Sequence, residues 1–315
     1  MPIAILKRLA SLAATLAAVS IIVFLVMNVL PGDPAAVQLG TSAREDTLAA
    51  LRAEMGLDRP LPVRYAVWIG GALTGDLGTS STYGVPVAGL VLDRLAVTLP
   101  LALMAIGLAV AIALPLGILA ASRQNRAADW AASIFAQLGV ATPNFWIGLI
   151  LILIFAGRLG WLPSGGFPGW ADGLSGSLKA LLLPAVALAL PQAGVLTRVT
   201  RSAVLEVLNE DFVRTARAKG LTRRQALWRH AVPNALTPVV TILGLQFTFL
   251  IAGAVLVENI FTLPGLGRLA YQALTQRDLV VMQDVVLLLA MLVITVNFLV
   301  DLLQLALDPR LRRMP

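Results

Sequence analysis

Residues that could carry out chemistry are scarce in this chain. It has no cysteine, which excludes disulfides and thiolate metal sites, and its one histidine is His230. The patterns H-E-x-x-H, G-x-S-x-G and Walker A are absent from the sequence. The run Gly265–Ala270 matches the dinucleotide fingerprint G-x-G-x-x-G/A but lacks a βαβ context and a downstream acidic residue. We therefore predict no catalytic residue, no metal site and no cofactor on this chain, and we interpret His230 as a membrane-surface or helix-terminal residue.

A second group of candidates consists of polar side chains within apolar segments. Asn297, Asp301 and Gln304 are spaced i, i+4 and i+7, so they share one helix face. An ionisable residue inside a membrane is a functional candidate by default, but Asp301 lies near a predicted cytoplasmic helix end that water reaches, which favours a structural role. Four amide side chains are candidates for lining a substrate pathway, with helix packing as the alternative. They are Asn144, Gln192, Gln246 and Asn297.

A basic segment, residues 198–229, carries the most informative local signals. It contains eight Lys or Arg residues against three acidic ones. Asn209 or Glu210 can cap a short helix over about 211–219, and Gly220 follows in the position that commonly ends a helix. A short capped helix of this kind suits the docking of a soluble partner and the transmission of its motion.

A further helix is predicted directly after this short one. Thr222 and Gln225 have the spacing of a capping box, and the helix is expected to run until Pro233. A nucleic-acid-binding helix-turn-helix is the alternative interpretation. The segment is tethered at both ends by apolar spans and lacks a third helix, so we predict no nucleic-acid binding.

Membrane-spanning helices must position these residues. The chain of 315 residues is 58% hydrophobic and 13% charged, with a mean hydropathy of +0.85, far outside the range of soluble globular domains. The sequence contains five long apolar windows without a charged residue. A sixth apolar window is interrupted by Asp301. We predict an all-α integral membrane protein with six transmembrane helices. The predicted spans are 9–30, 95–121, 131–157, 180–200, 234–258 and 284–307.

The distribution of basic residues sets the predicted orientation. A net charge of +7 would also suit a nucleic-acid partner, but most of the 24 Lys and Arg residues fall in segments that an N-in, C-in arrangement places in the cytoplasm. The first span exceeds the apolar part of a signal peptide and lacks a cleavage site, so we expect it to be retained. The external segments are then 31–94, 158–179 and 259–283, and the cytoplasmic ones include 201–233 and the tail 308–315.

The long external segment 31–94 contains its own helix signal. Ser42 and Glu45 have capping-box spacing ahead of Leu48, and Gly56 is placed to end the helix that follows. This segment can contact an external protein, shape the mouth of a pathway, or act as a purely structural cap.

The basic segment resembles the permeases of binding-protein-dependent ATP-binding-cassette (ABC) importers, which carry the motif E-A-A-x₃-G-x₉-I-x-L-P. Arg214-Thr-Ala216, Gly220 and His230-Ala-Val-Pro233 fall at those spacings. The Glu, first Ala, Ile and Leu of the motif are replaced, as in the variant of the dipeptide, oligopeptide and nickel branch. The replacing residues are Arg214, Thr215, His230 and Val232.

Further motifs extend the resemblance over almost the whole chain, and the long first external segment looks like that of the first of two paired permeases. These motifs are Leu30–Pro34, Gly56–Pro60, Gly75–Gly78, Pro143–Trp146, Glu258–Phe261 and Pro264–Gly267. The resemblance implies that the short helix is the coupling helix, which sits in a groove of the ATPase. The residues assigned to coupling in this way are Asp211, Phe212, Val213, Arg214, Thr215, Ala216, Arg217, Lys219, Gly220 and Leu221.

The resemblance also implies a function, a fold and a set of partners. It predicts a type I ABC importer permease in a prokaryotic cytoplasmic (inner) membrane, moving di- or oligopeptides by alternating access. The implied partners are the lipid bilayer, a second homologous permease, two cytoplasmic ATPases that bind ATP and Mg, and an external substrate-binding protein. Nickel, glutathione and haem are alternative substrates.

Two other classes of protein are alternatives to this function. An ion-driven secondary transporter is expected to show mid-span acidic residues and an internal repeat, and the first five spans show neither. An intramembrane enzyme would need one of the catalytic patterns that the sequence lacks.

Overall fold

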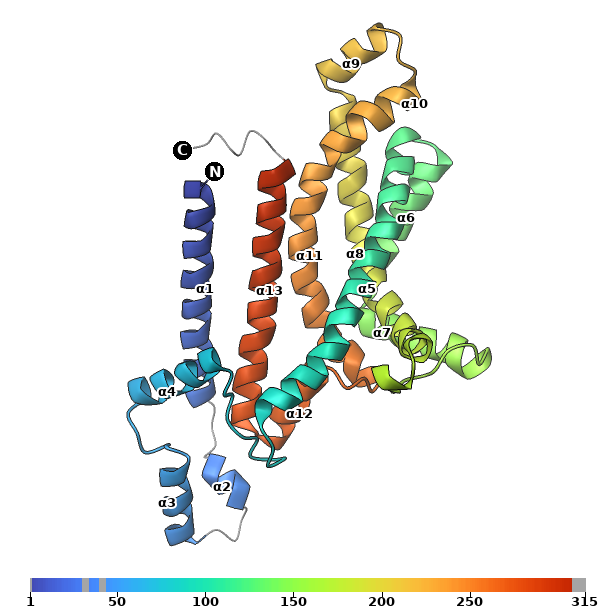
Figure 1. Ribbon diagram of the computed structural model, residues 1–315. Helices are drawn as coiled ribbons and strands as arrows, with labels where there is room; N and C mark the ends of the chain where they lie inside the picture. The colour runs from blue at the N-terminus through green and yellow to red at the C-terminus, as the bar shows by residue number, and fades with distance from the viewer. Residues whose placement is uncertain (1, 30–33, 40–43, 308–315) are drawn as a thin grey trace. The chain divides into compact units, whose positions relative to one another are not determined.

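The computed structural model describes residues 2–29, 34–39 and 44–307. Within these ranges the regular structure is helical (Figure 1). The described residues form no β-strand, and the β-structure among them is an isolated antiparallel bridge between Thr79 and Pro86. Five helices are long and apolar enough to cross a membrane, or six if a sharply bent pair is one span. The helices are α1 (Pro2–Val29), α2 (Pro34–Leu39), α3 (Glu45–Glu54), α4 (Leu61–Thr74), α5 (Val87–Ser122), α6 (Ala127–Ala141), α7 (Asn144–Leu151) with a π-helical extension (Ile152–Arg158), a 3-10 turn (Trp170–Asp172), α8 (Leu174–Leu208), α9 (Asp211–Ala218), α10 (Arg223–Ala226), a π-helical turn (Leu227–Ala231), α11 (Val232–Ile260), α12 (Leu266–Gln276) and α13 (Leu279–Leu307).

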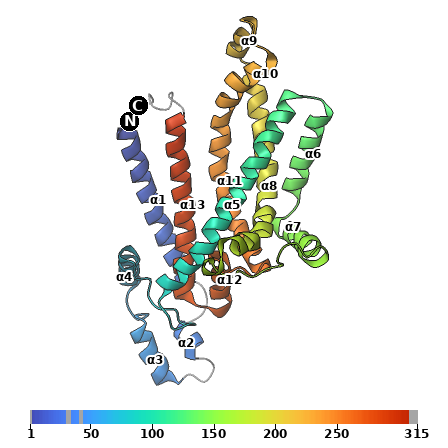
Figure 2. The ribbon, with the colours of Figure 1, turned by 45° about the vertical axis from the view of Figure 1, so that its right-hand side comes forward.

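The chain divides into two compact units, and the larger is built mainly on residues 99–263. Its most enclosed helix is α8, which packs against α6, α7 and α11 (Figure 2). A Cβ on Gly139 of α6 would lie 2.9 Å from the carbonyl oxygen of Leu190, and one on Gly194 of α8 would lie 2.8 Å from that of Ala136. These reciprocal glycines let α6 and α8 approach closely, as small residues do between helices in membranes.

The smaller unit joins most of α1 to α2, α3, α4, the start of α5, α12 and the first half of α13. Phe24 of α1 lies 5.4 Å from Tyr65 and 6.0 Å from Trp68 of α4, measured between ring centroids. The indole Nε1 of Trp68 donates a hydrogen bond of 2.7 Å to Asp284 of α13. The turn before α13 is held by the buried Asp278, whose carboxylate accepts hydrogen bonds from the Ser80 hydroxyl and, at 3.1 Å, from the Thr82 amide. Aromatic contacts thus tie α1 to α4, and hydrogen bonds to carboxylates tie α4 and the loop after it to α13 and the turn before it.

The predicted span 131–157 is not one continuous helix in the structure. The chain bends by 101° between α6 and the helix that starts at Asn144. Thr142 is extended, with φ −97° and ψ 123°, and Pro143 follows it. Proline has no amide hydrogen and disfavours helical backbone in the residue before it, so it breaks a segment that hydropathy reads as continuous.

Other predicted boundaries also shift. The helix after Thr222 does not stop at Pro233: helical structure is continuous from Arg223 to Ile260, through the π-helical turn. Pro233 directly follows the π-helical turn Leu227–Ala231, and a local π-helical adjustment of this kind lets a membrane helix tolerate a proline. All six predicted spans start inside a helix that begins earlier, because apolarity marks the membrane-embedded part of a helix and not its whole length. The observed starts are α1 at Pro2, α5 at Val87, α6 at Ala127, α8 at Leu174, α11 at Val232 and α13 at Leu279.

The helix signal in segment 31–94 is partly confirmed. α3 begins at Glu45 with Arg44 as its N-cap and no side-chain capping bond, and Ser42 lies outside the described residues. Gly56, with φ +65°, follows the C-cap and ends the helix as predicted.

Candidate functional site

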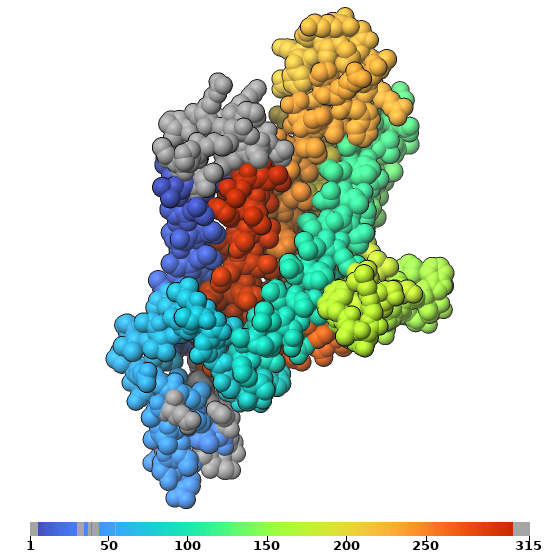
Figure 3. Space-filling view, viewed as in Figure 1, coloured from blue at the N-terminus to red at the C-terminus, as the bar shows by residue number. Residues whose placement is uncertain are grey.

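The predicted coupling segment forms a compact helix, α9, between α8 and α10. Figure 3 shows α9 and α10 projecting beyond the ends of α5 and α6. Glu210 is the N-cap of α9, but no side chain caps the helix; Asn209 instead donates its Nδ2 to the carbonyl oxygen of Leu205 at 3.0 Å. The predicted N-cap position at Glu210 is therefore confirmed, but neither Glu210 nor Asn209 caps α9 with its side chain. The amide of Asn209 is used inside the last turn of α8 because that carbonyl lies within its reach.

The end of α9 matches the prediction closely. Gly220 adopts φ +97°, its N–H donates to the carbonyl of Arg217 at 3.0 Å, and the N–H of Leu221 donates to that of Ala216 at 3.3 Å. This pair of bonds is a Schellman motif, in which a glycine in the left-handed region ends the helix. A Cβ on Gly220 would meet no atom within 4 Å, so its backbone conformation, and not space within this chain, selects glycine.

α9 has one buried position and a wide exposed face. Val213 is 1% exposed and so supports α9 from within this chain, whereas the adjacent Phe212 is 45% exposed. Ala216 and Leu221 are half-buried. The ion pair between Arg214 and Asp211, at 3.6 Å, is open to solvent and contributes little stability. The remaining predicted coupling residues are exposed: Thr215, Arg217, Lys219 and Gly220.

The segment after α9 is stabilised by a capping box at the start of α10 and by an apolar cluster behind it. The hydroxyl of Thr222 accepts the N–H of Gln225 at 3.3 Å, and the Gln225 side chain accepts the N–H of Thr222 at 2.9 Å, so the predicted capping box is confirmed. Behind it lies an apolar cluster that joins the ends of α5 and α8 to the start of α11. Its buried members are Ile118, Ala121, Ala203, Val204, Leu227, Ala231, Val232 and Ala235.

A buried ion pair near this cluster was not anticipated from the sequence. Arg201 of α8 forms two hydrogen bonds to the carboxylate of Asp129 in α6, one of them 2.8 Å long from Nη2 to Oδ2. The N–H of Asn125, in the turn between α5 and α6, donates to the same carboxylate at 2.9 Å. Asp129 is 4% exposed. The one available signal was a single acidic residue beside the basic turn 123–126, and it did not identify a partner 72 residues away.

The four pathway candidates all belong to the larger unit and are buried or half-buried. Gln192 and Gln246 are buried, at 8% and 4% exposure. Asn144 and Asn297 are half-buried, and each approaches a glycine of α11: Gly253 for Asn144 and Gly244 for Asn297. None of the four lines either of the two cavities described below. These positions favour the helix-packing alternative.

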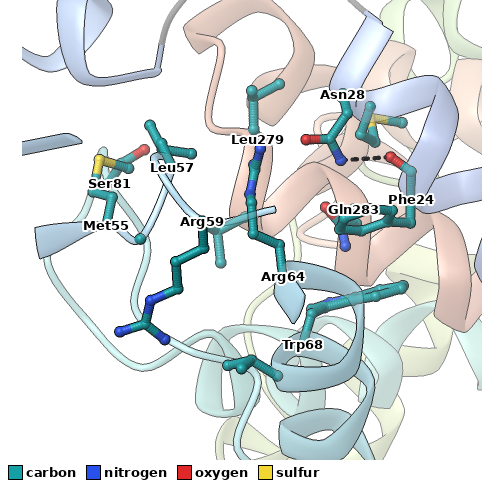
Figure 4. Close-up of a pocket in the computed structure, with 14 residues that line it drawn as sticks. Phe24, Asn28, Met55, Leu57, Arg59, Arg64, Trp68, Ser81, Leu279 and Gln283 are labelled. Atoms are coloured by element: carbon teal, nitrogen blue, oxygen red, sulfur yellow. Dashed lines mark hydrogen bonds between the residues drawn. The ribbon is translucent and has the colours of Figure 1, made fainter. Parts of the chain in front are cut away.

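The smaller unit holds a cavity of about 230 Å³ among α1, α4, α13 and the turn after α3 (Figure 4). In Figure 4 the Arg64 side chain extends into this space, whereas Arg59 points away from Asn28 and Gln283. Burial lowers the pKa of the Arg64 guanidinium. The cavity is lined by apolar side chains with a few polar ones, and Asn28 uses its amide locally, donating to the carbonyl of Phe24 at 2.7 Å.

Two sequence patterns lie in unremarkable settings. Gly265–Ala270 covers the N-cap and first turn of α12, and no strand precedes it in the described part of the chain. His230 lies in the π-helical turn, where its carbonyl accepts the Asn234 side chain at 2.7 Å. Across residues 2–29, 34–39 and 44–307, no group of three or more His, Asp or Glu side chains could hold a metal ion.

Comparison with known sequences points to transport systems. Residues 113–313 match the family described as binding-protein-dependent transport system inner membrane component, and residues 1–102 match the N-terminal part of such components. A putative peptide transport system permease protein of Brucella abortus (strain 2308) is 42% identical over 98% of both chains. A probable peptide ABC transporter permease protein of Sinorhizobium fredii is 41% identical over 99% of this chain and 100% of its own. A glutathione transport system permease protein of Salmonella choleraesuis is 40% identical over 98% of both chains.

Comparison with solved structures concerns the fold. An inward-facing structure of the MetNI methionine ABC transporter aligns with a TM-score of 0.59 and 21% identity, covering 70% of this chain and 96% of the other. An amino acid ABC transporter crystallised with histidines aligns with a TM-score of 0.54 and 20% identity, covering 69% and 93%. The predicted all-α membrane fold, similar to ABC importer permeases, is confirmed.

Proposed function

Because the chain belongs to the family of binding-protein-dependent transport system inner membrane components, we propose that it is one of two homologous permeases enclosing the pathway of an ATP-driven peptide importer. The chain is a permease subunit and not an enzyme, since ATP and Mg belong to separate ATPase subunits in this family. In the proposed assembly two ATPases lie on the cytoplasmic side, with both chain termini, and an external binding protein delivers the solute. Membership of this family sets aside the secondary-transporter alternative.

Peptide is the proposed substrate class. The Brucella and Sinorhizobium relatives, at 42% and 41% identity over nearly their full length, are named for peptides, and the glutathione relative, at 40%, is named for a short peptide. Uptake by the reconstituted complex with its binding protein distinguishes the alternatives: labelled dipeptide, glutathione, nickel and haem are each offered alone. Transport of nickel or haem without transport of either peptide would overturn this assignment.

The observation that carries the coupling proposal is the exposure of α9. Phe212, 45% exposed, lies next to the buried Val213, so α9 is anchored on one side and free on the other. An exposed aromatic side chain is the type of residue that anchors a protein interface. Val213 was assigned to coupling with the others, but its burial favours a role in holding α9 in place.

Movement of α9 has a physical route into the membrane. α9 joins α8 directly, and the continuous helical stretch Arg223–Ile260 begins three residues after Gly220. The bonds between Arg201 and Asp129 fasten the end of α8 to the start of α6. A partner that displaces α9 therefore biases α6, α8 and α11 together, which is the coupling that alternating access requires.

Single cysteines test the docking surface, since the chain has no native cysteine. In Arg217→Cys, the thiol should react with a maleimide in the free permease and be protected in the complex with the ATPases. Asp172→Cys, at an exposed position in a predicted external segment, is the control and should react equally in both. Equal labelling of Arg217→Cys in both states would contradict the assignment.

A side-chain truncation tests the anchor. Phe212→Ala should lower solute-stimulated ATPase activity, because an aromatic anchor contributes about 2 kcal/mol or more to an interface. Phe249→Ala removes a ring that is 65% exposed on α11 and should leave activity near wild type. Wild-type turnover in Phe212→Ala would argue against α9 as the contact.

A further inference from the structure

A groove of about 920 Å³ runs between the last turns of α5 and the α10–α11 segment, within the larger unit. Its depth is apolar and includes Leu114, Ile118, Leu119 and Leu236. All four residues belong to helices that are long and apolar enough to span a membrane. The groove is thus an apolar channel along the side of two candidate spans.

The mouth of this groove is cationic. Arg123, Arg223 and Arg224 line it, and no carboxylate does. All three arginines are exposed, and none of their guanidinium groups forms an ion pair with any residue in the described part of the chain. Three cationic groups converge here on a space that holds no compensating anion.

The boundary between the apolar floor and the cationic mouth of the groove coincides with the ends of two candidate membrane spans. One candidate span ends at Ser122, directly before Arg123, and another begins at Arg223. Trp228, 52% exposed, also lines the groove one turn further in. Tryptophan is enriched at membrane–water interfaces, and basic pockets between transmembrane helices on the cytoplasmic side bind anionic lipid head groups.

We propose that this groove binds an anionic phospholipid of the inner leaflet, with its phosphate on the three arginines and an acyl chain along the apolar floor. Guanidinium groups match phosphate oxygens in bidentate geometry, and the floor matches a hydrocarbon chain in polarity. The site lies beside the α10 capping box, so an occupied groove stiffens the segment that supports α9. This proposal requires α5 and α11 to lie in a bilayer and does not depend on the coupling role of α9.

Lipid retention by the purified complex tests the charged mouth. The complex is reconstituted in nanodiscs of phosphatidylcholine with one-tenth phosphatidylglycerol, extracted, and its bound lipid measured by native mass spectrometry. Neutralising Arg123, Arg223 and Arg224 to Gln should lower retained phosphatidylglycerol by about fivefold per arginine. The matched control neutralises Arg126, Arg158 and Arg229, which are exposed and do not line the groove, and should retain wild-type levels. Equal loss in the two triple variants would refute a defined site.

Two further measurements identify the occupant, and they decide the matter if the triple variant fails to assemble. Leu119→Trp narrows the floor with all arginines intact and should also lower lipid retention, which simple electrostatic adsorption would not show. A photo-crosslinking amino acid at position 119 should yield an adduct with the mass of phosphatidylglycerol. An adduct with the second permease or an ATPase would mean that a protein covers the groove, and loss of phosphatidylglycerol on adding inorganic phosphate would mean that a free anion occupies the mouth; either result overturns the proposal.

Discussion

Replacement of Asp129 by alanine removes the group that fastens the α5–α6 turn to α8. In the native chain the carboxylate accepts two hydrogen bonds from Arg201 and one, at 2.9 Å, from the N–H of Asn125. The variant leaves a guanidinium in the helix interface without its counter-ion and frees the turn at Asn125, which adopts the left-handed conformation with φ +61°.

The size of the effect follows from burial. Removal of one partner of a buried ion pair costs about 3–5 kcal/mol. The Asp129 side chain is 6% exposed, but that of Arg201 is 27% exposed, so water can solvate part of the orphaned cation. We therefore expect about 3 kcal/mol, the lower end of the range, which corresponds to roughly a hundredfold increase in opening of the turn.

Hydrogen–deuterium exchange of the intact complex in nanodiscs measures this opening directly. Peptides over residues 123–130 should exchange faster in Asp129→Ala, whereas Asp172→Ala, at an exposed carboxylate, should match wild type. Adding Arg201→Ala to Asp129→Ala should recover part of the protection, because no charge is then left unpaired. Exchange of 123–130 within twofold of wild type in the single variant would refute the assigned role of the pair.

Three further predictions concern close helix packing, a side-chain cap and a glycine in the left-handed region. Gly194→Ala should lower the thermal midpoint of the complex, because its Cβ would lie 2.8 Å from a carbonyl oxygen, while Gly107→Ala, with open space around it, should keep or raise that midpoint. Thr222→Ala should weaken the start of α10 by about 1 kcal/mol, seen as faster amide exchange at 223–226, and Thr241→Ala on α11 should leave those amides unchanged. Gly220→Ala forces alanine to φ +97°, at a cost of about 1–2 kcal/mol, and should reduce solute-stimulated ATPase activity without loss of assembled permease.

Local signals explain which parts of the structure were predictable. The end of α9 at Gly220 and the start of α10 at Thr222 depend on residues within one turn, so the sequence pattern and the structure agree. The long apolar helices were predictable for a similar reason, because spanning a bilayer requires a run of apolar residues that can be counted.

Features that depend on distant residues were missed. Asp129 and Arg201 are 72 positions apart, and neither has a local pattern that points to the other. The burial of Val213 depends on how α9 packs back on the chain, and so a pattern that grouped it with the exposed Phe212 could not separate their roles. The bend at Pro143 was not predicted, because a hydropathy average over a window is insensitive to one residue that interrupts the helix.

The helix ends on both sides of that bend satisfy their own hydrogen-bonding groups. The hydroxyl of Thr142 donates to the carbonyl of Leu138 at 2.7 Å, the side chain of Asn144 accepts the N–H of Phe145 at 2.8 Å, and the carbonyl of Pro143 accepts the N–H of Trp146 at 3.1 Å. In lipid, the hydrogen-bonding groups of the backbone must find partners within the protein. The groups beside this corner have such partners, so the corner can lie out of water. Each of these bonds lies on one side of the corner, and none joins α6 to α7 across it. The backbone groups beside the corner therefore keep their partners if the angle between α6 and α7 changes, so the corner can act as a hinge that leaves no polar group unsatisfied in lipid.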